Sequence, residues 1–158
     1  MPRNASETRR KILDAAYRQF YQRGYNRVGV DEIATAAKVT KRTLYVHFES
    51  KDKLLADALD HYRQLAVQQT RDWASRLGGN ANDMIDGLFG DLHRWGAKPR
   101  FAASGFTRLA MELADMPGHP ARAVARRHKS FIESTIAEKL ADAGVRRPKD
   151  RARNTASD

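Results

Sequence analysis

Apolar residues recur along this chain at the three- and four-residue spacing of α-helices, and no stretch has the strict alternation of a half-buried strand. The pattern therefore predicts an all-α protein. Its first stripe predicts a helix over residues 6–23, capped by Ser6 and ended by Gly24 in a left-handed conformation. The members of that stripe are Ile12, Leu13, Ala16 and Phe20.

Two short helices follow, over residues 30–38 and 41–48, with no proline between them. Thr40 is suited to cap the second helix, in which Leu44 and Phe48 lie four residues apart on one face. The remaining side chains of that helix are free to contact a partner, and a helix of this size fits the major groove of DNA. The functional interpretation is a helix-turn-helix, and the plain alternative is two ordinary helices with a solvated basic face.

Four longer patterns occupy the rest of the chain. Ser50 is expected to cap a helix of about 27 residues that continues to Gly78. Two amphipathic patterns then end near Gly96 and Leu113, and a turn at residues 115–120 leads into a last helix over 121–143, ended by Gly144. We expect a helix-turn-helix domain over 1–50, a second helical domain over 51–144, and a basic, disordered tail over 145–158.

Within Gly24 to Leu55, GYNRVGVDEIATAAKVTKRTLYVHFESKDKLL, several pieces stand in a specific order. They are Gly24-Tyr25, Ile33-Ala34, Val39, Thr43-Leu44-Tyr45, His47-Phe48 and Ser50-Lys51. In this order the segment resembles the N-terminal domain of the tetracycline-repressor-like (TetR) family of bacterial transcription regulators. The resemblance implies a three-helix DNA-binding domain over 1–50, joined by the long helix to a helical effector-binding and assembly domain over 51–144. It also implies that effector binding shifts the long helix and changes the spacing of two recognition helices, with repression as the expected sign.

The resemblance further implies which residues meet DNA. Lys41 and Lys51 are suited to phosphates, as is a backbone N–H near Val30, whereas Arg42 could contact a guanine edge. The full predicted set is Val30, Thr40, Lys41, Arg42, Thr43, Tyr45, His47 and Lys51. The chain departs from the family where hydroxyl residues often precede the second helix, and Arg42 stands where glycine or alanine is frequent.

Composition agrees with a polyanionic partner but does not locate the site. The net charge is +10 and the pI about 10.2. Residues 1–50 hold ten Lys or Arg and five Asp or Glu, which leaves 19 and 14 for the rest. With no cysteine, no signal-peptide pattern and no membrane-length apolar run, we expect a cytoplasmic protein. The five histidines lack the spacing of metal ligands, and no group of residues has the pattern of a catalytic site. We therefore expect no bound metal, no cofactor and no enzymatic activity.

The aromatic residues after position 70 could line an effector pocket between helices. The predicted contacts are Trp73, Leu88, Trp95 and Phe106, and their character favours an apolar small molecule. Ordinary core packing accounts for the same spacing and is the stronger alternative.

Homodimers are expected for the family, but the segment that begins RRPKD has no large apolar residue. We therefore expect the family's dimerisation helices to be missing here, and dimerisation to be weak or absent. Two other functions remain open. One is a small-molecule-binding bundle without DNA activity, which an electrophoretic shift would separate. The other is a membrane-surface protein, which liposome flotation would test.

Overall fold

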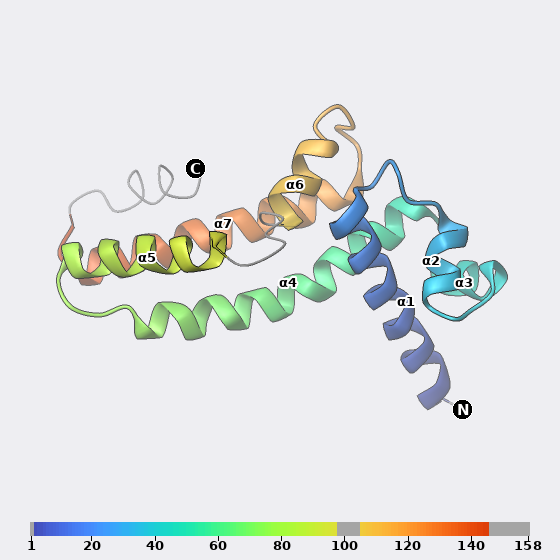
Figure 1. The fold of residues 1–158 in the computed structure, drawn as a ribbon, viewed down its shortest axis with the longest axis horizontal. Helices are drawn as coiled ribbons and strands as arrows, with labels where there is room; N and C mark the ends of the chain where they lie inside the picture. Colours follow the sequence, from blue (N-terminus) through green and yellow to red (C-terminus); the bar gives the residue numbers. More distant parts are fainter. Residues whose placement is uncertain (1, 98–104, 146–158) are drawn as a thin grey trace. The chain divides into compact units, whose positions relative to one another are not determined.

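The computed structural model describes residues 2–97 and 105–145, which form α-helices and no strand (Figure 1). These two ranges contain seven helices, as the sequence predicts for an all-α chain. Their bounds are α1 Pro2–Arg23, α2 Val30–Ala36, α3 Lys41–His47, α4 Lys51–Arg76, α5 Ala81–Gly96, α6 Gly105–Glu112 and α7 Pro120–Asp142.

The chain divides into two compact units. The first contains residues 1–63 and 102–125, and the second contains residues 64–101 and 126–158. Both α4 and α7 begin in the first unit and end in the second. The domain bounds expected at residues 50 and 144 stay a prediction.

The first unit has a continuous apolar core. α2 and α3 pack against each other and against α1, and α6 also packs against α1 (Figure 1). The predicted apolar positions are buried there: the fully buried large side chains are Ile12, Phe20, Val28, Ile33, Leu44, Phe48, Leu54, Leu55, Leu59, Leu109 and Leu113. Burying a side chain of this size stabilises the fold by about 1.5–3 kcal/mol. Tertiary packing therefore holds two seven-residue helices that would be unstable alone.

The second unit has a smaller core. Met84 of α5 packs there with three buried residues of α7, Ile136, Ala137 and Leu140. Val145, which the sequence assigned to the polar tail, also packs against this cluster. The rest of that predicted tail, residues 146–158, lies outside the described residues.

Most predicted helix ends are confirmed by their hydrogen bonds. Thr40 caps α3 by accepting the Thr43 N–H at 3.0 Å, and the Ser50 hydroxyl accepts the Lys53 N–H at 3.1 Å. Gly24 ends α1 with φ +87°, and Gly144 follows α7 with φ +77°. Pro120 begins α7 where its missing N–H costs nothing.

The predicted start of the first helix is wrong. α1 begins at Pro2, so Ser6 lies inside the helix and does not cap it. Proline is favourable in a first turn, and Thr8 donates its hydroxyl hydrogen to the Asn4 carbonyl within the extra turn. A serine can cap a helix, but it can also lie inside one, as Ser6 does here.

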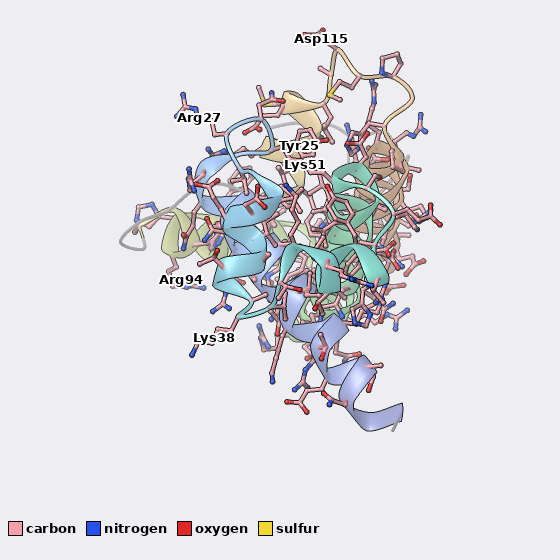
Figure 2. All side chains as sticks on the ribbon, turned by 90° about the vertical axis from the view of Figure 1, so that its right-hand side faces the viewer. Tyr25, Arg27, Lys38, Lys51, Arg94 and Asp115 are labelled. Carbon is pink, nitrogen blue, oxygen red and sulfur yellow. The ribbon has the colours of Figure 1, made fainter. Side chains whose placement is uncertain are left out.

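The turn between α2 and α3 contains a strained residue. Lys38 has φ +56°, the one non-glycine residue with positive φ among those described. Its N–H bonds the Thr35 carbonyl at 3.0 Å and the Val39 N–H bonds the Ala34 carbonyl at 3.0 Å, which together close α2. Glycine normally occupies this position because a Cβ costs energy there. Figure 2 shows the Lys38 side chain pointing outward from the turn.

Candidate nucleic-acid interface

The exposed face of α3 is defined by the two residues that anchor it. Leu44 is fully buried and Phe48 is 2% exposed, as predicted from their spacing. At 100° per residue, Arg42 and Val46 lie on the side of the helix opposite Leu44. The face that points away from the core therefore presents a guanidinium beside an apolar side chain.

The Arg42 guanidinium is available for a partner. It is exposed, and within the described residues no hydrogen bond or ion pair engages it. A planar, unengaged guanidinium can donate two parallel bonds to the O6 and N7 atoms of guanine. The contact of Arg42 with a guanine edge stays a prediction.

Val46 was missed in the sequence reasoning. It is 76% exposed, the most exposed of the large apolar side chains described. An exposed apolar residue on a recognition helix is suited to the methyl group of thymine. The signal was present in the sequence, because Val46 follows Arg42 by four residues and both lie opposite Leu44.

Lys41 and Thr43 are engaged in local contacts. The Lys41 ammonium lies 3.0 Å from a carboxylate oxygen of Asp31, and this bond raises the lysine pKa. The hydroxyls of Thr40 and Thr43 share a hydrogen bond of 2.8 Å, which leaves one O–H of the pair to donate elsewhere. Asp31 therefore competes with phosphate for Lys41, a contact that periodicity could not predict across ten residues.

The start of α2 carries negative charge. Val30 is half-buried, and Gly29 before it offers no capping side chain, as the sequence predicts. The Glu32 carboxylate accepts the Gly29 N–H at 2.8 Å and also pairs with Arg23. These bonds lower the Glu32 pKa, the backbone bond most, and keep the carboxylate ionised.

Tyr45 and His47 flank the exposed face. Tyr45 is 45% exposed, whereas His47 is half-buried with its ring centroid 6.4 Å from that of Phe48. The phenol of Tyr45 can therefore reach a partner directly, while His47 presents only part of its ring. Their phosphate contacts stay a prediction.

Lys51, at the start of α4, lies over the ring of Tyr25, with its Nζ 4.2 Å from the ring centroid (Figure 2). Partial burial lowers the pKa of Lys51, and the neighbouring Asp52 carboxylate opposes this shift. The cation is thus held in one place by an aromatic face, which favours a defined phosphate contact over a freely moving charge.

The predicted effector residues lie in different surroundings. In the second unit, Leu88 is buried, Trp95 is 40% exposed, and Trp73 donates its indole N–H to Asp91 at 2.7 Å. The hydrogen bond from Arg94 lowers the Asp91 pKa most, and the hydrogen bond from Trp73 lowers it further. Phe106 is buried in the first unit. These four residues stay a prediction for an effector site.

Cavities and metal sites offer little else in the described ranges. A hollow of about 80 Å³ in the second unit is far smaller than the roughly 300–1,000 Å³ typical of ligand pockets. It is lined by Leu77, Gly78, Gly79, Met84, Lys139, Asp142 and Ala143. No three metal-ligating side chains come together among the described residues. None of the described helices is both long enough and apolar enough to span a membrane.

Comparison with known proteins shows which proteins this chain is similar to. Residues 12–58 match the family described as bacterial regulatory proteins, tetR family. The regulator TtgR of Pseudomonas putida is 37% identical over 84 residues, which are 53% of this chain and 37% of TtgR. The A-factor receptor protein of Streptomyces griseus is 32% identical over 117 residues, 73% of this chain and 40% of the receptor. The aligned part of this chain thus spans about two fifths of these relatives' length.

Solved structures extend the likeness over more of the chain. A TetR-family transcriptional regulator from Streptomyces coelicolor has 30% identity and a TM-score of 0.72, covering 86% of this chain and 71% of that one. A tetR-type regulator from Streptomyces avermitilis has 28% identity and a TM-score of 0.81, covering 94% and 80%. Together with the buried anchors and exposed face of α3, these matches show that the chain belongs to the TetR family of bacterial regulatory proteins.

Proposed function

We propose that this chain binds operator DNA through α3 and acts as a transcriptional repressor, and that an apolar small molecule releases it from the DNA. The observation that carries the proposal is the face opposite Leu44, where an unengaged Arg42 lies beside the exposed Val46. A guanidinium and an apolar side chain can read a guanine edge and a thymine methyl group. Lys51 and the one hydroxyl of the Thr40–Thr43 pair that remains a donor supply phosphate contacts, which set the position of the protein along the DNA.

Two features support DNA over other partners. The net charge of +10 favours a polyanion, and both TtgR and the Streptomyces coelicolor protein are named as transcriptional regulators. The effector part of the proposal draws support from a relative named as the receptor of A-factor. For this chain the proposed contacts are Trp73, Leu88, Trp95 and Phe106, and their apolar character points to a hydrophobic effector.

Selection of bound duplexes from a random pool, followed by an electrophoretic shift, tests the DNA part. Enrichment of one sequence over its scrambled form is the expected result, and equal binding of both would refute operator recognition. Failure to bind any duplex would favour the alternative, a ligand-binding bundle without DNA activity.

The effector part has its own test. Titration of tryptophan fluorescence with a set of small hydrophobic compounds should give saturable changes, and the same compounds should release the selected duplex. A strongly charged metabolite as the sole ligand would contradict the apolar site.

A further inference from the structure

We propose that Glu112 and His119, which lie outside the predicted DNA-reading helices, are positioning residues for Lys51 and so set how firmly the chain holds DNA phosphates. The inference deepens the proposed DNA binding and rests on it. It is carried by a chain of contacts within the first unit that connects α6 and the start of α7 to the first turn of α4.

Tyr25 is the centre of these contacts. Its ring lies under the Lys51 ammonium, and its hydroxyl donates a hydrogen bond to the Asp52 carboxylate. Burial, and then the Asp52 carboxylate, raise the Tyr25 pKa, so the phenol keeps its proton and remains a donor. The position of this ring therefore decides where the Lys51 charge lies.

Glu112 holds the backbone of Tyr25 from α6. One carboxylate oxygen accepts the Tyr25 N–H at 2.6 Å, and the other lies 3.5 Å from the guanidinium of Arg108. Arg108 also donates to the Tyr21 carbonyl at 3.1 Å, beside the end of α1. A Cβ at Gly24 would displace the Glu112 carboxylate from its present position, and the positive φ of Gly24 separately favours glycine there.

His119 contacts the same group from the start of α7. His119 is 5% exposed, and its ring meets the Tyr25 ring edge-on, with the two ring centroids 5.1 Å apart. The Nδ1 atom accepts the Ala121 N–H at 3.1 Å and so caps α7. A nitrogen that accepts this bond carries no proton, so the proton of the neutral ring lies on Nε2.

The protonated Nε2 atom faces Asp52. It lies 3.6 Å from Asp52 Oδ1 and has no hydrogen-bond partner, although its side chain is fully buried. A buried donor of this kind costs free energy unless a nearby acceptor compensates, and Asp52 is the acceptor that it faces. The cap on α7 thus orients a donor toward the residue that follows Lys51.

These contacts give the α6–α7 segment a route to the DNA face that avoids α2 and α3. Lys51 and Asp52 are the first residues of α4, and Tyr25 joins them to Glu112 and His119. Loss of either positioning residue should free the Tyr25 ring and let Lys51 move. Base preference should persist, because Arg42 and Val46 are not part of this set.

The first test needs no DNA. In the full chain with 13C-labelled lysine, the methylene protons beside Lys51 Nζ should be shifted upfield by the Tyr25 ring, and Tyr25→Leu should assign that signal by removing its shift. His119→Asn keeps a capping oxygen for α7 but removes the imidazole, so the Lys51 signal should move toward those of the other lysines. His93→Asn, at an exposed histidine of α5, is the matched control and should leave the signal in place.

Glu112 allows a rescue within the same measurement. Glu112→Ala removes the acceptor for the Tyr25 N–H and should shift the Lys51 signal, whereas Glu112→Gln keeps an acceptor oxygen and should retain most of the wild-type shift. Circular dichroism confirms that each variant is folded. An unchanged Lys51 signal in both folded variants, His119→Asn and Glu112→Ala, would overturn the proposal.

The second test measures binding to the selected duplex and its scrambled form over a range of salt. His119→Asn should weaken both duplexes by the same factor and reduce the slope of log K against log salt by about one for each lost phosphate contact. A changed sequence ranking or an unchanged slope would overturn the link to phosphate binding. If the wild-type chain shows the Lys51 shift but binds no DNA, the positioning of Lys51 stands and the proposed function fails.

Discussion

Replacing Arg42 by alanine separates sequence reading from general attraction to DNA. The guanidinium is exposed and unengaged within the described part of the chain, so its loss should change the free energy of unfolding by less than about 0.5 kcal/mol. A bidentate contact with guanine contributes about 1–3 kcal/mol of discrimination. At 1.4 kcal/mol per factor of ten, the correct duplex should lose about 5- to 140-fold in affinity.

Fluorescence anisotropy on a set of duplexes, each with one guanine of the selected site replaced, provides the assay. Wild-type protein should discriminate at one guanine that Arg42→Ala no longer distinguishes. Arg126→Ala, at an exposed arginine of α7, removes the same charge and should leave the ranking intact. If Arg42→Ala weakens all duplexes equally, Arg42 contacts phosphate or solvent and the assignment is refuted.

Four further predictions concern α3, its turn and the start of α7. Leu44→Ala should lower the free energy of unfolding by about 2–5 kcal/mol in urea denaturation, because the side chain is fully buried; a loss below about 1 kcal/mol would contradict its anchoring role. Lys38→Gly should raise the free energy of unfolding by about 0.5–1 kcal/mol, which is the relief of positive φ less the entropy cost of glycine, and should therefore raise Tm; a lower Tm would show that the turn is unstrained. Val46→Ser should reduce discrimination between thymine and uracil at one position of the selected duplex, and unchanged discrimination would place Val46 outside the groove. Burial lowers the pKa of His119 in the folded chain, and Asp52 opposes this shift, so the unfolded chain binds more protons than the folded one. The contribution of His119 to the free energy of unfolding should therefore be fully present above about pH 6.5 and fall as the pH drops toward the lower pKa of the folded state. Urea denaturation from pH 5 to 8 should show a smaller fall for His119→Asn, and equal curves would contradict this account.

The helices and the core face of α3 could be predicted from the sequence because their causes are local. Helical spacing selects Leu44 and Phe48 for burial, and Thr40 and Ser50 bond backbone groups within three residues. The start of α1 could not be predicted in the same way. A serine suits either a cap or a helix interior, and the choice depends on whether the preceding residues gain from being helical.

Tertiary structure alone decided how the proposed DNA face is supported. Asp31 meets Lys41 across ten residues, Tyr25 meets Asp52 across 27, and Glu112 reaches Tyr25 across 87. No periodic pattern connects such positions, since each contact exists only after helices distant in the sequence, or on either side of a turn, have packed together. The sequence by itself determined which side of α3 is buried and which side is exposed. Packing determined which charges on that side are engaged, which are free, and which distant residues hold Lys51 in place.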